Sequence, residues 1–368
     1  MFDDIRPFRN NEVAAVIQNL INEPELQSSL ARFIMPTFYK VSPRFSQKII
    51  KYLLKFRQNL LTDVDQIQNE VSKYLYRIIN KSTHGFSYNG LEKIDTSKPT
   101  LFISNHRDIV LDSALVNLAL HQSGINTVES AVGDNLLKKQ WVADLMRLNK
   151  SFIVKRNEKT KRAMLNASKN LSAYIHYSLT QNQQNIWLAQ REGRAKDGID
   201  KTNPALISML LLNKEKSDSI GEYLQQLNII PVAISYEFDP CDTQKAIELA
   251  TKETTGNYEK SDNEDFESIT QGLMGHKGHV HLEFCQPLTG DFENSQTVAE
   301  AIDQQIITHY KLFDSNLAAF AHLNDKYADD SILTNLQERM KNLNELQQQW
   351  LLKMYANPVL AKLSLNSP

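Results

Sequence analysis

Cysteine is nearly absent from this chain, since only Cys241 and Cys285 occur in 368 residues. Two thiols cannot build a disulfide framework, which fits a reducing compartment. Long apolar runs are missing too, and no window approaches the roughly 20 uninterrupted apolar residues of a membrane span. The N-terminal stretch MFDDIRPFRNNEV is acidic where a signal peptide is basic, and no apolar core follows it. We therefore expect a cytoplasmic protein, with peripheral attachment to the inner face of the membrane left open.

An excess of one charge is also missing. Lys and Arg number 41 against 43 Asp and Glu, for a formal net charge of -2. Without a global basic field, nucleic acid is not an expected partner.

The charge balance breaks down locally in residues 26–62, which hold seven basic residues and no acidic one. A helical projection places Lys48, Lys51 and Lys55 on one face. Another face collects the apolar side chains Phe45, Ile49, Leu53, Phe56 and Leu60. Such a basic amphipathic helix fits an anionic membrane surface, where each basic residue contributes about 1 kcal/mol. The alternative is a bundle helix whose apolar stripe packs on the rest of the protein.

Residues 1–95 have helical spacing with no clear period of two, which predicts an N-terminal helical region. The amphipathic helix within it is either the membrane-surface helix or the bundle helix described above. Residues 96–290 alternate apolar or β-branched runs with helical stretches, and residues 291–368 are helical again. The expected strands are PTLFISN, NTVESAV, SFIVKR, NIWLAQ, IIPVAISYE and GHVHLEF. This alternation predicts an α/β fold whose central mixed, largely parallel sheet is flanked by helices, with an N-terminal helical region and a C-terminal helical extension. The polar residues 251–268 predict a loop or a weakly ordered insertion before the last strand.

A polar cluster follows the first of these strands, in the stretch LFISNHRDIVLD. His106, Arg107, Asp108 and Asp112 lie where a strand is expected to end and a helix to begin, the usual place for a site in an open α/β sheet. A neutral imidazole can take a proton from an alcohol when a carboxylate fixes its other ring nitrogen. The structural alternative is that Asp108 caps the helix while His106 and Asp112 have no chemical role.

The same stretch also resembles the catalytic loop H-R-D-L-x-x-x-N of protein kinases. That interpretation fails because Ser113 occupies the asparagine position and no glycine-rich G-x-G-x-x-G lies upstream. The only VAI stretch lies downstream and continues with Ser235 rather than lysine.

Three further blocks follow the polar cluster along the chain. The four are SNHRDIVLD, SFIVKR (151–156), REGRAKDG (191–198) and IIPVAISYE (229–237). In this order they resemble the motifs of the glycerolipid acyltransferases, the superfamily of glycerol-3-phosphate and 1-acylglycerol-3-phosphate acyltransferases. Those motifs are N-H-x-x-x-x-D, an apolar strand ending in Arg, E-G-x-R-S-x-x-G, and an apolar strand with an early proline. The resemblance covers about residues 96–290.

Two blocks depart from the family pattern. Five residues instead of four separate His106 from Asp112, and on a helix one extra residue turns a side chain by roughly 100°. Asp112 is the favoured partner of His106 and Asp108 the alternative. In the third block, aligning the basic residues and the glycine shifts Glu192 by one place.

The resemblance implies a reaction and a set of roles. A fatty acyl group would move from acyl-CoA or acyl-carrier protein to a hydroxyl of glycerol 3-phosphate or lysophosphatidate in phospholipid synthesis, by direct attack and without a cofactor or metal. His106 would be the general base, oriented by Asp112 or Asp108. Substrate-binding residues would come from all three of the first blocks: Arg107, Lys155, Arg156, Glu192, Gly193, Arg194 and Lys196.

Other functions remain as alternatives. A non-catalytic lipid- or membrane-binding protein that retains the fold would explain the irregular blocks. A hydrolase would use water in the same site, although no G-x-S-x-G elbow exists. His276, His279 and His281 resemble a metal cluster, but no supporting acid is evident nearby and we assign no metal.

Overall fold

The computed structural model describes residues 1–261, 264–324 and 330–365. The chain divides into two compact units that alternate along the sequence. The first unit comprises Met1–Tyr74 and Glu129–Asn170, and the second comprises Leu75–Val128 and Leu171–Pro368. The domain boundaries that the sequence suggested, at residues 95 and 290, follow the motifs and stay a prediction. Within the described residues, no helix combines the length and the apolar composition needed to cross a bilayer.

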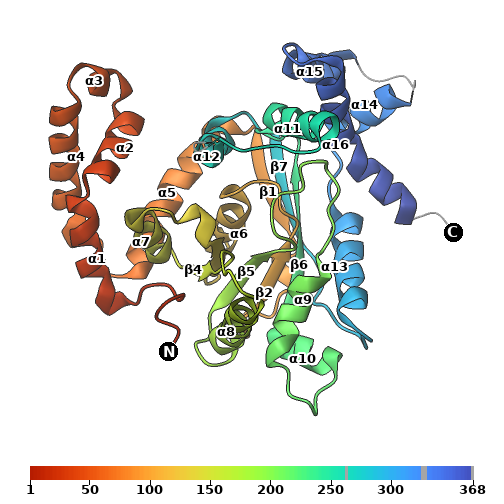
Figure 1. The fold of residues 1–368 in the computed structure, drawn as a ribbon, viewed down its shortest axis with the longest axis horizontal. Coiled ribbons are helices and arrows are strands. Elements are labelled where there is room, and N and C mark those ends of the chain that lie inside the picture. Colours follow the sequence, from red (N-terminus) through yellow and green to blue (C-terminus); the bar gives the residue numbers. More distant parts are fainter. Residues whose placement is uncertain (262–263, 325–329, 366–368) are drawn as a thin grey trace. The chain divides into compact units, whose positions relative to one another are not determined.

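The second unit contains five neighbouring strands of the sheet, in the order β1-β7-β6-β2-β5 (Figure 1). β2 pairs in parallel with both β5 and β6, β1 pairs in parallel with β7, and only β6 and β7 are antiparallel. The sheet is therefore mixed and largely parallel, as the sequence predicted. The strands are β1 (Gly85–Asn89), β2 (Leu101–Ser104), β5 (Asn185–Ala189), β6 (Ile229–Tyr236) and β7 (His279–Phe284).

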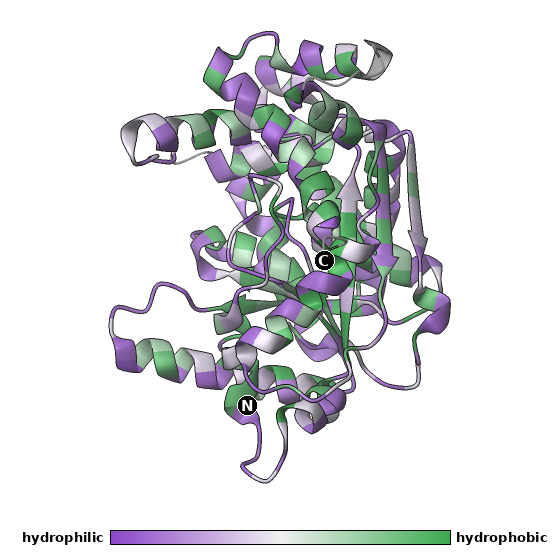
Figure 2. Ribbon diagram, turned by 90° about the vertical axis from the view of Figure 1, so that its right-hand side faces the viewer, coloured by the Kyte–Doolittle hydropathy of each residue, from purple (hydrophilic) through white to green (hydrophobic). Residues whose placement is uncertain are grey.

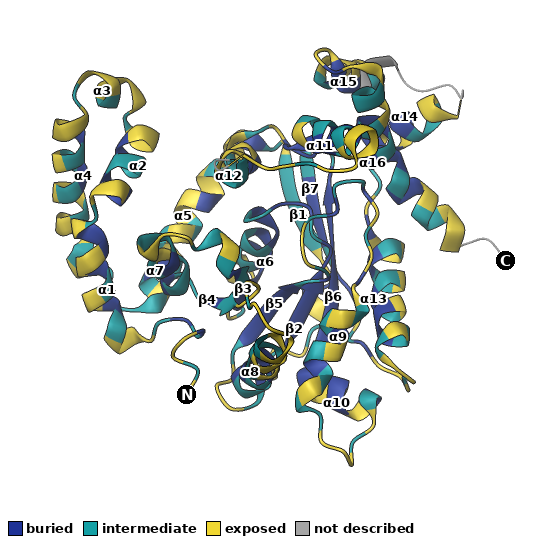
Figure 3. Ribbon diagram, in the orientation of Figure 1, coloured by how far each residue is buried: buried dark blue, intermediate teal, exposed yellow. Residues whose placement is uncertain are grey.

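Helices cover both faces of this sheet, with α6 and α13 on opposite sides in Figure 1. Alternate residues of β6, from Ile230 to Tyr236, join the apolar core formed with α6, while α13 packs on the same strand. All of β6 is buried, as expected of a central strand covered on both faces (Figure 3). The helices of this unit are α6 (Leu111–Gln122), α9 (Pro204–Leu210), α10 (Ile220–Leu227), α11 (Asp242–Thr255), α12 (Glu264–Met274), α13 (Ser295–His309), α14 (Asp314–Leu323), α15 (Asp330–Met340) and α16 (Glu345–Leu365), with short 3-10 turns at Leu91–Lys93 and Leu211–Asn213.

The first unit is mainly helical, with one parallel pair of strands, β3 (Val128–Gly133) and β4 (Ser151–Val154). Its core joins α1, α2, α5 and α7 through residues such as Val13, Ile67 and Leu148. α2, α3 and α4 each begin with proline, which suits the first helical position because its amide has no intrahelical partner there. The helices are α1 (Asn10–Asn22), α2 (Pro24–Ile34), α3 (Pro36–Val41), α4 (Pro43–Arg57) and α7 (Gln140–Leu148), with 3-10 turns at Gln58–Leu60 and Asp134–Leu136; α5 (Val64–Ser82) and α8 (Lys161–Thr180) continue into the second unit.

Two local expectations are wrong. β1 is a strand inside the stretch predicted to be helical. It is short and polar, so its sequence GFSYN carries no clear alternation, and its pairing with β7 decides its conformation. Residues 251–268 are not one loop. α11 continues to Thr255, where Gly256 ends it at a φ of 77°, and α12 begins at Glu264; residues 262–263 lie outside the described part. Like the other helices around the sheet, these carry hydrophobic and hydrophilic residues side by side (Figure 2).

Candidate active site

The polar cluster begins where β2 ends. The Asn105 side chain continues the pairing of β2 with β6, because its amide donates to the Ile234 carbonyl (2.9 Å) and its oxygen accepts from the Ile234 amide (2.7 Å). Asn105 is fully buried, so these two bonds satisfy polar groups that water cannot reach. The asparagine of the first block thus fixes the turn from which His106 projects.

His106 and Asp112 meet despite the extra residue between them. Nδ1 of His106 lies 2.9 Å from Oδ2 of Asp112, the second residue of α6. Oδ2 also accepts from the backbone amides of Arg107 (2.6 Å) and Asp108 (2.9 Å), so the loop wraps around the carboxylate. The Asp112 side chain is fully buried, whereas that of His106 is 15% exposed. Asp112 therefore orients the imidazole, and only the imidazole can meet a substrate.

Asp108 has a different task. Its Oδ1 accepts from the amides of Val110 (3.0 Å) and Leu111 (2.8 Å), which closes the turn that starts α6. Gly272 of α12 lies directly above it, and a Cβ there would come within 2.2 Å of Oδ2. Burial, and then the charge of Asp112, raise the pKa of Asp108. The structure thus places Asp112, not Asp108, at His106.

Arg107 points into the protein. Its guanidinium is buried, pairs with Asp200 at 2.6 Å and donates to the Gly198 carbonyl at 3.2 Å. The Arg107 carbonyl in turn accepts from the buried Lys245 (2.7 Å), which also pairs with Asp239. These contacts explain Arg107 as an anchor of the loop, and its substrate-binding role stays a prediction.

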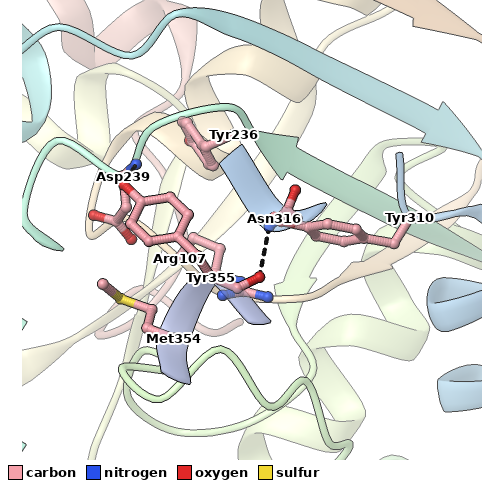
Figure 4. Close-up of a pocket in the computed structure, with 7 residues that line it drawn as sticks. All are labelled: Arg107, Tyr236, Asp239, Tyr310, Asn316, Met354 and Tyr355. Atoms are coloured by element: carbon pink, nitrogen blue, oxygen red, sulfur yellow. Dashed lines mark hydrogen bonds between the residues drawn. The ribbon is translucent and has the colours of Figure 1, made fainter. Parts of the chain in front are cut away.

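A small cavity borders Arg107, with a volume of about 10 Å³ (Figure 4). That volume suits about one water molecule, so this cavity is not the substrate site. Its lining residues are Arg107, Tyr236, Asp239, Tyr310, Asn316, Met354 and Tyr355.

The third block is tied to the first through its backbone. The Ala195 amide donates to the His106 carbonyl at 2.8 Å. Gly198 adopts a φ of 78°, and a Cβ there would come within 2.1 Å of the Met354 carbonyl of α16, so only glycine fits. Gly193 is exposed at a φ of 74°. The block's glycines therefore shape a loop that lies against His106.

The two basic residues of this loop differ in their partners. Lys196 pairs with Glu248, which also holds Lys252 at 2.7 Å. Nη1 of Arg194 is buried and has no hydrogen-bond partner within the described residues. Of the two side chains, Arg194 therefore has the less satisfied charge, and its predicted contact with phosphate stays a prediction. Glu192 is exposed on the same loop.

Lys155 and Arg156 belong to the first unit, where they follow β4. Nζ of Lys155 lies 2.6 Å from Asp4, and the Arg156 amide donates to Asp134 at 3.2 Å. The structure thus gives both residues local partners at the end of a strand, and their predicted contact with phosphate stays a prediction.

The histidines near β7 form two separate contacts. Ser87 of β1 lies within hydrogen-bond distance of both His279 (2.7 Å) and His281 (2.8 Å). Nε2 of His276 instead lies 3.2 Å from Nε2 of His84. Across residues 1–261, 264–324 and 330–365, no three His, Cys, Asp or Glu side chains are arranged to hold a metal ion.

Sequence reasoning missed three residues that complete the site. Asp200 pairs with Arg107, Asn105 joins β2 to β6, and the Tyr236 hydroxyl donates to Oδ1 of Asp112 at 2.9 Å. Asn105 stands in the first block and Tyr236 ends the apolar run IIPVAISY, so each offered a signal, whereas Asp200 follows a loop without regular spacing.

The family model described as Acyltransferase matches residues 85–202, which include the first three blocks. Among solved structures, the chain is similar to the 1-acyl-sn-glycerophosphate (LPA) acyltransferase PlsC from Thermotoga maritima, with 14% identity and a TM-score of 0.41 over 77% of this chain and 92% of that one. No curated protein matches the chain. Residues 85–202, which hold three of the four blocks, are therefore similar to the Acyltransferase family, and the chain carries a domain of that kind.

Proposed function

We propose that this protein transfers a fatty acyl group from the thioester of acyl-CoA or acyl-carrier protein to a hydroxyl of glycerol 3-phosphate or lysophosphatidate. The observation that carries the proposal is the pairing of His106 with the buried Asp112 at 2.9 Å. A carboxylate at Nδ1 leaves the opposite ring nitrogen, Nε2, to accept a proton from an acceptor hydroxyl.

In the proposed reaction the acyl group passes directly from the thioester to the acceptor, without an acyl-enzyme. The acceptor oxygen attacks the thioester carbonyl while its proton passes to Nε2 of His106, and the negative charge of Asp112 stabilises the imidazolium that forms. Collapse of the tetrahedral intermediate breaks the carbon–sulfur bond, and the imidazolium returns its proton to the leaving thiolate. The products are an ester and a free thiol.

Arg194 is the residue proposed to bind the acceptor's phosphate. Its loop is bonded to His106 through Ala195, and its Nη1 lacks a partner within the described residues. Lys196 supports it at longer range, because Glu248 already neutralises that ammonium group. The predicted contact of Lys155 and Arg156 with phosphate is not used in this proposal.

Membrane attachment through residues 26–62 is part of the proposal. The side chains of Phe45, Leu53 and Phe56 on α4 are 55%, 45% and 74% exposed. These three side chains of the stripe are thus exposed in the first unit, and the neighbouring Lys48 and Lys55 are exposed too. Apolar side chains beside basic ones fit an anionic bilayer surface, from which a lysophospholipid can be drawn.

Acceptor-dependent thiol release tests this function. We expect purified protein to release thiol from palmitoyl-CoA or palmitoyl-acyl-carrier protein only when glycerol 3-phosphate or lysophosphatidate is added. His106→Ala should lose at least about 100-fold, the usual contribution of a general base, while the control His322→Ala on α14 keeps wild-type activity. Release that does not depend on the acceptor would indicate a hydrolase, and no release from folded, liposome-bound protein would indicate a lipid-binding protein.

A further inference from the structure

We propose that Tyr236 is a positioning residue of the site, which holds the Asp112 carboxylate in the orientation that His106 requires. This inference rests on the proposed role of His106 as general base. Tyr236 lies outside the matched residues 85–202, at the end of β6, and reaches the site only through the fold.

Tyr236 takes the carboxylate oxygen that the loop leaves open. Oδ2 of Asp112 is bound by His106 and by the amides of Arg107 and Asp108, whereas Oδ1 accepts from the Tyr236 hydroxyl at 2.9 Å. A carboxylate held by one oxygen can rotate about its side-chain torsion, and a bond at the second oxygen fixes that rotation. The position of Oδ2 relative to Nδ1 of His106 thus depends on Tyr236.

The tyrosine itself cannot move. It is 4% exposed and belongs to the apolar core to which β6 and α6 both contribute, together with residues such as Ile234 and Leu115. Burial, and then the charge of Asp112, raise the pKa of Tyr236 well above its usual range, so the hydroxyl keeps its proton and donates. The rigid sheet thereby supplies a fixed donor to a residue on the neighbouring helix.

The hydrogen bond from Tyr236 offsets the repulsion that Asp112 feels from neighbouring carboxylates. The buried carboxylates of Asp108 and Asp200 both interact unfavourably with Asp112. The nearby cations already have partners, because Arg107 pairs with Asp200 and Lys245 pairs with Asp239. Besides His106, hydrogen bonds from two amides and from Tyr236 therefore hold the charge of Asp112 in place.

Tyr236→Phe removes only the hydroxyl and tests the role. We expect kcat to fall about tenfold, as loss of one hydrogen bond to a charged group implies, with the KM for the acceptor nearly unchanged. Without the Tyr236 donor, more negative charge faces the imidazole, so the acid limb of the pH–rate profile should move to higher pH. The control Tyr223→Phe, a buried tyrosine on α10 that stacks on His176, should change neither quantity.

A double-mutant cycle with Asp112→Asn separates positioning from general damage. If Tyr236 acts through Asp112, Tyr236→Phe should cost little further activity in the Asp112→Asn background. Equal losses in both backgrounds, or an unmoved acid limb, would overturn the inference even when His106→Ala is inactive. Full activity of His106→Ala would instead overturn the proposed function itself.

A second variant covers the case in which Tyr236→Phe does not fold. Incorporation of 3,5-difluorotyrosine at position 236 keeps the ring and makes the hydroxyl a stronger donor. The acid limb should then move to lower pH, opposite to the effect of phenylalanine. No movement in folded protein would contradict the role of the hydroxyl.

Discussion

Oδ2 of Asp112 lies 2.9 Å from Nδ1 of His106 although five residues separate them in the sequence. The contact forms because α6 begins only at Leu111, so that Asp112 stands in its first turn and faces back into the loop. The extra residue is absorbed by the turn that Asp108 closes. A departure from the family spacing thus leaves the pair of side chains together.

The two aspartates should differ in mutants. Asp112→Asn removes the charge that stabilises the imidazolium, and we expect turnover to fall by about 1,000-fold or more, as for other orienting aspartates. Asp108→Asn keeps an oxygen for the amides of Val110 and Leu111, so activity should fall less than tenfold. Steady-state kinetics with matched melting temperatures decides this, and the reverse order of losses would assign the role to Asp108.

Arg194→Ala should weaken acceptor binding. We expect the KM for a phosphate-bearing acceptor to rise about 10- to 100-fold, as loss of a charge-assisted contact implies, with the KM for the donor unchanged. Lys201→Ala removes a nearby exposed charge as the control. Equal losses for donor and acceptor would exclude Arg194 as the residue that binds the phosphate.

The apolar stripe of α4 should govern membrane binding. Phe56→Ser removes a side chain that is 74% exposed, and we expect about tenfold weaker binding to phosphatidylserine vesicles, because burying one such side chain contributes about 1.5–3 kcal/mol. Leu317→Ser on α14, 48% exposed, is the matched control. Vesicle co-sedimentation measures both, and equal binding by the two variants would remove α4 from the membrane contact.

Gly198 should be irreplaceable for structural reasons. Gly198→Ala brings a Cβ against the Met354 carbonyl in addition to the strain of a positive φ, and we expect a cost of about 3 kcal/mol or more. Gly124→Ala has a similar φ of 70° but meets nothing within 4 Å, so it isolates the strain, about 1 kcal/mol. Chemical denaturation compares them, and equal costs would mean that α16 does not approach this loop.

Lys277 should make stability depend on pH. Burial lowers the pKa of Lys277 to about 8 from an unfolded value of 10.5. Between these values the unfolded chain binds more protons than the folded one, so stability rises with pH by at most about 3 kcal/mol across the window. The difference between wild type and Lys277→Met in free energy of unfolding, measured from pH 7 to 11, should show this rise. A difference that does not vary with pH would contradict the lowered pKa.

The fold could be predicted largely because its strands are buried on both faces. Runs such as IIPVAISY are typical of strands covered on both faces, and all six strand predictions correspond to β2 through β7. β1 could not be found this way, because its polar residues gain their conformation from Ser87 and its neighbours pairing with β7. The alternation of the two units along the chain could not be predicted from the sequence either, because it depends on long-range contacts.

Some residues of the site could likewise be predicted from local motifs, whereas others come together only in the folded protein. His106, Asp112 and the basic residues of the third block lie in short motifs and could be predicted. Tyr236 lies 124 positions from Asp112, so their contact exists only once the sheet has formed. Nor could the sequence show that Asp200 occupies the Arg107 guanidinium. Such pairings are decided by tertiary packing and not by local spacing.

His106 is proposed to activate an acceptor hydroxyl. The most direct test of this role is mass-spectrometric detection of the ester formed from palmitoyl-CoA or palmitoyl-acyl-carrier protein and lysophosphatidate or glycerol 3-phosphate, with wild type, His106→Ala and the control His322→Ala. Ester formation by wild type and His322→Ala, and none above background by folded His106→Ala, is the predicted result. Ester formed by His106→Ala at the wild-type rate would contradict the claim.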